Sequence, residues 1–299
     1  MSTRWLTVRL GCAAALVLGT LSCDAEVRIP DDDDGGGSTS AAGGESSSTS
    51  SAGGAPTTGA GGSGGSGGSE PDAEALVKAQ CPEVGAESHF CVTVSYPGTL
   101  YAVGPDTGNI CYLGTIGGLE GEGVSSIAVV GPNVHGCSHN VGVWRAPVLG
   151  GAAEILPIDC GALTGYQGGF LLGGEPYANL IRHYADFESV GSDSELQSFD
   201  IEPKTSMTAR QGTLFTAGFS TGQLNVYDLP SSTELPDLEL EDFAQEIDGI
   251  SVTSDGRLYV LSNGASIFAF DATTGEQLQQ QWNVPTPDSL LTTLHCWTN

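Results

Sequence analysis

The stretch IDGISVTSDGRLYVLS, from Ile247 to Ser262, indicates how the larger part of this chain folds. Two short apolar segments flank the pair Asp255-Gly256, whose residue types suit the positive-φ positions of a tight hairpin turn. The same alternation of short apolar segments with Gly, Asp, Ser and Pro turns fills the rest of the domain that begins at about Glu74, which predicts a nearly all-β domain. Only residues 72–80 (DAEALVKAQ) predict a helix, and it is short.

A strand-then-turn unit recurs along the domain. Its clearest copy is IFAFDATTGE, which starts at Ile267, and LYAVGPDTGN, which starts at Leu100, matches it well. With three weaker copies, the unit starts at positions 100, 141, 181, 224 and 267. Successive starts are therefore 41, 40, 43 and 43 residues apart. A period of about 40–45 residues with four short strands is typical of β-propeller blades.

The residues of these units resemble the β-propeller repeat families of the YVTN, NHL and TolB-like kind. Ile247 to Ser262 carries the best match, and VWRAPVLGGAAEIL (Val143 to Leu156) is similar to a TolB-type outer hairpin. The resemblance spans about residues 88 to 299. It implies a propeller fold and assigns no catalytic residue.

The repeat length sets the number of blades. Residues 88 to 299 number 212, and division by a period of about 42 gives about five blades of four strands. SHFCVTVS (Ser88 to Ser95) opens the first unit without an innermost strand of its own, and SLLTTLHCW (Ser289 to Trp297) ends the chain without a blade. We therefore expect the C-terminal strand to close the first blade. A six-bladed ring with one degenerate unit is the alternative.

The N-terminus has the features of a secretory signal. Arg4 and Arg9 precede the apolar run Leu10 to Ser22, whose 13 residues are fewer than the roughly 20 that span a membrane as a helix. GTLSC (Gly19 to Cys23) resembles the lipobox of bacterial lipoproteins, in which the signal is cut before an acylated cysteine. We therefore predict a signal peptide over 1–22 and lipidation of Cys23; an ordinary cleaved signal is the alternative.

Composition divides the rest of the chain. Residues 23–72, the lipidated cysteine and an acidic, then Gly-, Ser-, Thr- and Ala-rich stretch, predict a flexible tether with a typical reach of roughly 35–40 Å. Residues 73–87 form the short helix and lead-in, and 88–299 the propeller domain. The expected location is the bacterial cell envelope, at the outer membrane or cell surface rather than the inner membrane.

Charge excludes one class of partner. After Cys23 the chain has 36 acidic residues against 7 basic ones (the 9 of the whole chain less Arg4 and Arg9), a net charge of −29. Such a surface repels phosphate backbones, so we expect no nucleic acid partner. Contact with the membrane is expected through the lipid anchor only.

Six cysteines remain after Cys12 and Cys23, an even number typical of disulfides in an exported protein. They are Cys81, Cys91, Cys111, Cys137, Cys160 and Cys296. We predict a Cys91–Cys296 bond that locks the first strand of the domain to the last. A Cys81–Cys91 bond is the rival.

Candidate metal ligands are few. His135, Cys137 and His139 would share one face of a strand, but we expect Cys137 to form a disulfide instead. Glu122 and Asp248 precede expected innermost strands, Val124 to Val130 and Ile250 to Thr253, and would lie at the mouth of a central channel. Lactonase-type propellers place metal ligands there. We nevertheless predict no metal and no cofactor.

Glu234 to Asp248 contains seven acidic residues and no basic one. Asp237, Glu239 and Glu241 alternate with leucines, which predicts an outermost strand whose carboxylates oppose edge-to-edge pairing. A patch for a cation or a basic partner is the alternative.

No sequence motif assigns a catalytic residue. A nucleophile elbow, a P-loop and the HExxH zinc motif are all absent from the sequence. We therefore expect a binding or scaffold module that meets a protein or glycan at one propeller face. The alternative is a metal-dependent, lactonase-like or other hydrolase that uses the central channel.

Overall fold

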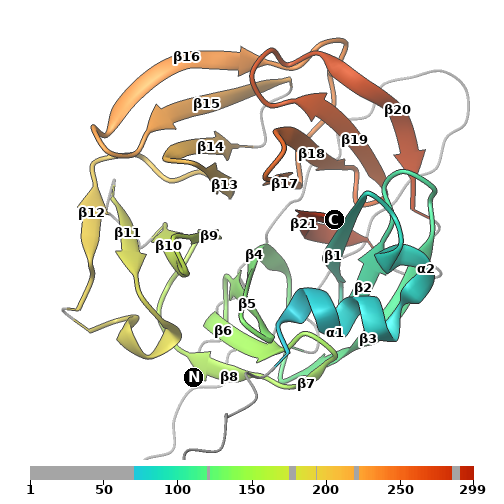
Figure 1. Ribbon diagram of the computed structural model, residues 1–299. Helices are drawn as coiled ribbons and strands as arrows, with labels where there is room; N and C mark the ends of the chain where they lie inside the picture. The colour runs from blue at the N-terminus through green and yellow to red at the C-terminus, as the bar shows by residue number, and fades with distance from the viewer. Residues whose placement is uncertain (1–70, 120–121, 175–179, 193, 219–221, 285–289) are drawn as a thin grey trace, which may run out of the picture. The chain divides into compact units, whose positions relative to one another are not determined.

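The computed structural model describes residues 71–119, 122–174, 180–192, 194–218, 222–284 and 290–299. The expected signal, Cys23 and nearly all of the expected tether lie outside these residues. Within them the fold is all-β: five four-stranded antiparallel sheets surround a central axis as the blades of a propeller (Figure 1). The prediction of five blades is confirmed, and the six-bladed alternative is wrong.

Each blade begins at the axis and ends at the rim. From innermost to outermost strand, blade 1 is β21 (Leu291–Thr298), β1 (His89–Ser95), β2 (Thr99–Val103) and β3 (Ile110–Gly117). Blade 2 is β4 (Val124–Val130), β5 (Asn133–Ser138), β6 (Gly142–Pro147) and β8 (Glu154–Leu156). Blade 3 is β9 (Ala162–Tyr166), β10 (Gly169–Gly173), β11 (Ile181–Tyr184) and β12 (Gln197–Phe199).

The last two blades follow the same order. Blade 4 is β13 (Ser206–Arg210), β14 (Thr213–Ala217), β15 (Gln223–Asp228) and β16 (Thr233–Glu239). Blade 5 is β17 (Gly249–Val252), β18 (Arg257–Ser262), β19 (Ser266–Asp271) and β20 (Gln277–Asn283). The five repeat units read from the sequence are β2, β6, β11, β15 and β19, so each is the third strand of its blade.

Two short elements depart from the simple repeat. β7 (Gly151–Ala152) lies between β6 and β8 in sequence but pairs in parallel with β3 of blade 1. β6 and β8 still form the antiparallel outer hairpin that residues 143–156 indicated. A single turn of 3₁₀ helix, η1 (Phe187–Ser189), follows β11 and buries Phe187.

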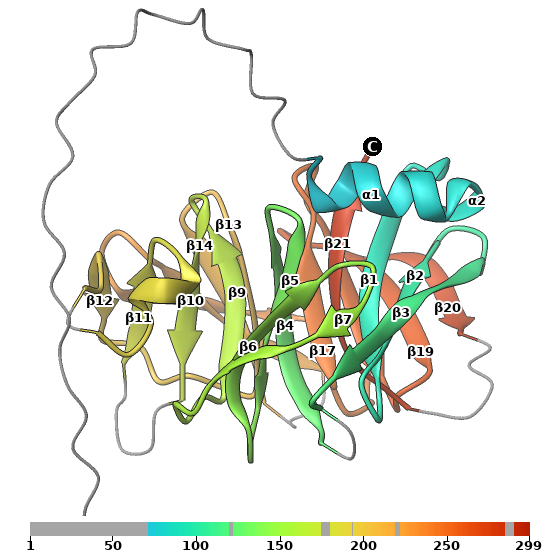
Figure 2. The same ribbon diagram turned by 90° about the horizontal axis from the view of Figure 1, so that it is seen from below.

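The expected helix forms on one face of the ring (Figure 2). α1 (Ala73–Gln80) begins after Asp72, whose carboxylate accepts a hydrogen bond from the Ala75 amide at 2.8 Å. Its buried residues Ala73 and Val77 pack in the same core cluster as Phe90 of β1. A second helix, α2 (Pro82–Gly85), follows directly and was not predicted.

Side-chain hydroxyls join the innermost strands of neighbouring blades. An innermost strand has no sheet partner on its axial side, so some of its amides need acceptors from elsewhere. Serine and threonine of the adjacent blade supply them: Leu163 N to Ser126 Oγ (2.6 Å), Ile250 N to Ser206 Oγ (3.1 Å), Val252 N to Thr208 Oγ1 (3.0 Å) and Cys296 N to Ser251 Oγ (2.9 Å). These hydrogen bonds connect neighbouring blades through polar side chains.

The ring closes as the sequence indicated. β21 pairs antiparallel with β1, Cys91 lies opposite Cys296, and a disulfide joins them. The rival Cys81–Cys91 bond does not form, because Cys81 pairs with Cys111. Cys137 pairs with Cys160 and so links blade 2 to the start of blade 3.

Polar side chains connect blades 5 and 1 at the seam. His89 Nε2 lies 2.9 Å from Asp255 Oδ2, and the Nδ1 side faces Asp106 at 3.5 Å. Burial opposes the ionisation of Asp255, but hydrogen bonds from Thr253 and His89 outweigh it and hold the pKa of that carboxyl well below its usual range. In the hairpin turn that contains Asp255, only Gly256 has a positive φ, so the expectation holds for the glycine alone.

The acidic stretch occupies the expected place. β16 is the outermost strand of blade 4; Leu238 is its buried residue, and the other six residues of the strand are exposed. Asp237 accepts hydrogen bonds from Gln223 and Asn225 of the neighbouring strand. Glu241 lies beyond the end of the strand, where it accepts a hydrogen bond from the Gln277 amide.

Candidate functional site

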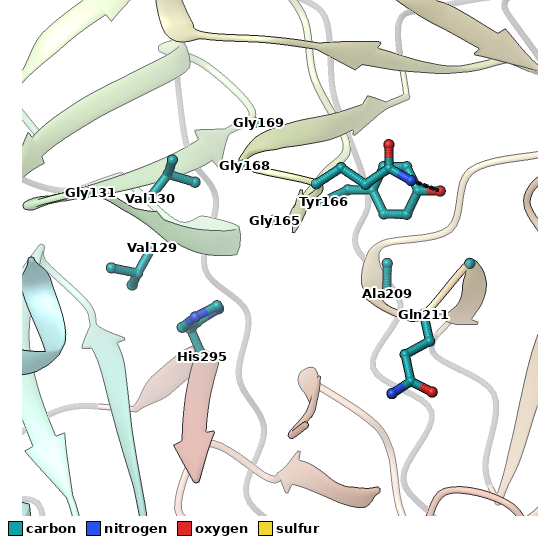
Figure 3. Close-up of a pocket in the computed structure, with 12 residues that line it drawn as sticks. Val129, Val130, Gly131, Gly165, Tyr166, Gly168, Gly169, Ala209, Gln211 and His295 are labelled. Carbon is teal, nitrogen blue, oxygen red and sulfur yellow. Dashed lines mark hydrogen bonds between the residues drawn. The ribbon is translucent and has the colours of Figure 1, made fainter. Parts of the chain in front are cut away.

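Pockets open at both ends of the central axis. The turns that follow β4, β9 and β13 line one of them, together with His295 of β21, and we call it the carboxyl-end pocket (Figure 3). The other, the amino-end pocket, is lined by residues at the starts of β4, β13, β17 and β21 and by the turn between β18 and β19. Pockets where several structural elements converge are the usual ligand sites of such folds.

The carboxyl-end pocket has a volume of about 510 Å³. This size lies within the range of about 300–1,000 Å³ common for small-molecule sites. None of its lining residues carries a charged side chain: Val129, Val130, Gly131, Gly165, Tyr166, Gln167, Gly168, Gly169, Ala209, Gln211, Gly212 and His295. In a chain with a large excess of carboxylates, this pocket is a neutral patch.

Two equivalent turns place glutamine side chains at this pocket. Gln167 and Gln211 each have φ +50, and each is followed by a glycine with φ above +80, which is the backbone of a two-residue hairpin turn with both residues left-handed. Glutamine is an uncommon choice for such a position, where Asn, Asp or Gly meet less strain. Both side chains are exposed at the pocket.

Tyr166 has its ring held from two directions. Its hydroxyl accepts a hydrogen bond from the Gln167 side-chain amide at 3.0 Å, drawn as a dashed line in Figure 3. The ring also makes a T-shaped contact with His183 of β11, with 5.1 Å between ring centroids. Burial lowers the pKa of His183, although a hydrogen bond to the Tyr166 backbone opposes that effect. The tyrosine is therefore a fixed, half-buried aromatic surface.

His295 reaches the pocket from the strand that closes the ring. Its imidazole packs edge-on against Trp297 at 4.8 Å. Within the described part of the chain, neither of its ring nitrogens has a hydrogen-bond partner. Burial lowers the pKa of His295 to about 4, so near neutral pH the ring is uncharged and offers one donor and one acceptor.

The amino-end pocket differs in the availability of its polar groups. Its volume is about 410 Å³, and Leu290 and Leu291 contribute apolar surface. Its polar side chains already bond within the protein: Ser125 to Cys137 O, Thr205 to Ala217 O, Thr292 to Val94 O, Asn263 to Gln245 and Asp248 to the Gly264 amide. The carboxyl-end pocket is thus the better candidate for binding a ligand.

Asp248 and Glu122 do not converge on a metal site. Burial raises the pKa of Asp248, partly offset by the hydrogen bond from the Gly264 amide. Glu122 instead accepts a hydrogen bond from Asn140 at 2.9 Å. Among the residues that the structure describes, no group of three or more His, Cys, Asp or Glu side chains is placed to hold a metal ion.

The cluster around Cys137 does not assemble either. The sulfur of Cys137 is committed to Cys160, and β5 ends at Ser138, so His139 is exposed in the following turn rather than on the strand face. His135 is buried and stacks on Phe170 with 5.5 Å between ring centroids. Burial lowers its pKa to about 4, and the nearby Arg145 acts in the same direction. The three residues therefore do not share one strand face, and Cys137 forms the disulfide that competed with metal binding.

The sequence reasoning missed the residues of the carboxyl-end pocket. One signal was present: YQGG (166–169) and RQGT (210–213) repeat a Gln-Gly pair 44 residues apart, one blade period. A residue type ill suited to its backbone position, repeated in two blades, points to a use other than folding.

Comparisons with known proteins assign no family. No protein-family model matches the sequence, and no curated protein shows significant similarity to it. A protein of unknown function from Bacteroides caccae aligns with a TM-score of 0.48 and 12% identity, over 71% of this chain and 99% of that one. A nidogen/laminin complex aligns with a TM-score of 0.46 and 10% identity, over 70% of this chain and 97% of that one. Apo AztD from Citrobacter koseri aligns with a TM-score of 0.33 and 15% identity, over 68% of this chain and 62% of that one. These likenesses assign neither ligand nor activity.

No helix among the described residues is long and apolar enough to cross a membrane.

Proposed function

We propose that this chain is an envelope lipoprotein, anchored through acylated Cys23, whose propeller is a binding module that meets its ligand at the carboxyl-end pocket. The lipobox-like GTLSC segment and the Gly- and Ser-rich stretch behind it support the anchor and the tether. The anchor would place the protein at the outer membrane or cell surface, and the partner would be a glycan or a protein rather than nucleic acid.

One observation supports the choice of site. The carboxyl-end pocket presents polar groups that the fold leaves unused: the Gln211 amide and the His295 imidazole have no hydrogen-bond partner within the described residues. Polar groups held by a rigid scaffold and left unpaired can bond to a ligand without first breaking bonds of their own. The amino-end pocket would have to break internal hydrogen bonds to do the same.

A matched pair of variants tests this function. Fluorescently labelled protein carrying Cys23→Ser is titrated onto envelopes isolated from cells that lack the protein. Gln211→Gly removes an amide side chain at a φ +50 turn position in the carboxyl-end pocket, where glycine meets no strain. Asn263→Gly makes the equivalent change at φ +51 in the amino-end pocket.

If the carboxyl-end pocket is the binding site, binding should saturate. Gln211→Gly should then weaken it at least tenfold, whereas Asn263→Gly should change it by less than twofold. Equal effects of the two variants, or binding that does not saturate, would show that the carboxyl-end pocket is not the binding site. Circular dichroism of both variants confirms that each remains folded.

A further inference from the structure

The chemistry of the carboxyl-end pocket restricts the class of its ligand. We infer that the pocket binds a neutral oligosaccharide, with one sugar ring lying on Tyr166 and its hydroxyls bonded to Gln211 and His295. The inference rests on the proposed function, since it names the ligand class of the same pocket. A protein segment is the other class that a propeller face could take, and the experiment below separates the two.

Charge excludes ionic ligands first. An anion would find no cationic side chain in the pocket lining, and it would approach a chain with a net charge of −29 after Cys23. The neighbouring Arg210 is not available, because its guanidinium donates two hydrogen bonds to Ser254 O, at 3.1 and 2.9 Å, in the next blade. A cation would find no carboxylate in the lining. An uncharged ligand therefore loses the least hydration free energy when it enters the pocket.

The polar groups of the pocket match hydroxyls in particular. A sugar hydroxyl both donates and accepts a hydrogen bond, so it pairs best with groups that do both. The glutamine amide, the tyrosine hydroxyl and the uncharged imidazole each carry a donor and an acceptor. The four polar side chains of the lining (Tyr166, Gln167, Gln211 and His295) belong to these three types.

The aromatic surface supplies the apolar part of the contact. One face of a sugar ring is largely C–H, and an aromatic ring is a suitable partner for such a face while its polar tip stays in water. Tyr166 is already fixed by His183 at 5.1 Å and by the hydrogen bond from Gln167, so its immobilisation costs little on binding. Gly165 and Gly168, where an added Cβ would meet no other atom within 4 Å, leave room for a ligand ring to approach.

Three immobilised panels test the ligand class with the folded Cys23→Ser protein: neutral oligosaccharides of hexose and N-acetylhexosamine units, oligosaccharides bearing uronic or sialic acids, and uncharged peptides. The inference predicts binding to at least one neutral oligosaccharide and to none of the acidic ones. Tyr166→Ala should weaken that binding at least tenfold, whereas Tyr166→Phe, which keeps the ring, should weaken it by less than about fivefold. His295→Ala should weaken it several-fold, and Asn263→Gly in the other pocket should leave it unchanged.

The outcomes separate the two levels of the argument. If the protein binds only the peptides, and Gln211→Gly weakens that binding, the oligosaccharide inference is overturned but the pocket remains a binding site. Binding to acidic oligosaccharides would also overturn it. Oligosaccharide binding that none of the pocket variants changes would overturn both the ligand class and the site.

Discussion

The disulfide at the ring seam should contribute more to stability than the other bond with equally buried sulfurs. Cys91 and Cys296 lie 205 residues apart, whereas Cys137 and Cys160 lie 23 apart. The two pairs are matched in burial: one member of each is fully buried and the other is 5% exposed. Replacing either pair by alanine therefore removes the same atoms from similar surroundings and differs chiefly in the loop that the bond closes.

The size of the difference follows from chain entropy. Closing a loop restricts the unfolded chain by an amount that grows as 1.5 RT ln n, which gives about 5 kcal/mol for the seam bond and about 3.5 kcal/mol for the shorter one. The ratio of the two separations alone predicts that the Cys91→Ala/Cys296→Ala variant loses about 2 kcal/mol more unfolding free energy than Cys137→Ala/Cys160→Ala. The seam variant also loses the covalent link between β1 and β21, which then depend on strand pairing and on side-chain contacts such as the stacking of Phe90 on Trp297.

Guanidinium chloride titration of the two double variants and the unaltered protein measures the difference, with fluorescence and circular dichroism followed together to establish a single transition. An equal loss in both variants, or a larger loss for the 23-residue loop, would refute the entropic account of the seam. A double variant that unfolds with a markedly smaller denaturant slope would instead show that the seam has opened in the native state.

Three further changes test other parts of the chain. Cys23→Ser should abolish the incorporation of labelled fatty acid and leave the protein soluble or uncleaved; label retained in that variant would contradict the lipobox assignment. Deleting residues 35–69 should change the unfolding free energy by less than about 1 kcal/mol, because a Gly- and Ser-rich tether buries nothing, and a larger fall by denaturant titration would show that the segment packs on the domain. His135→Phe should make the unfolding free energy less dependent on pH. In the native protein the pKa of His135 is about 4, below its unfolded value of 6.5, so the stability that the neutral ring contributes above pH 6.5 is lost as the pH falls towards 4. This loss amounts to as much as about 3 kcal/mol, and the variant should not show it. Melting curves between pH 7.5 and 4.5 that are equally pH-dependent with and without His135 would exclude this cause.

Much of the fold could be predicted from the sequence because its determinants are local and periodic. The repeat units at 100, 141, 181, 224 and 267 locate the third strand of every blade, since each blade repeats the same apolar segment and turn. The unpaired segments at the two ends of the domain indicated the closure, because a strand that lacks a neighbour in its own unit must find one elsewhere. The alternating residues around Leu238 likewise placed β16 at the rim.

Only the tertiary structure located the candidate site and showed that the candidate ligands His135, Cys137 and His139 do not assemble. His135, Cys137 and His139 are close in sequence, yet the end of β5 at Ser138 and the bond to Cys160 separate them. Tyr166, Gln211 and His295 are far apart in sequence and belong to three blades, yet they line one pocket. The physical reason is that a repeat is specified by contacts within a blade, whereas a pocket on the axis collects residues from several blades, and His295 joins it only when β21 closes the ring.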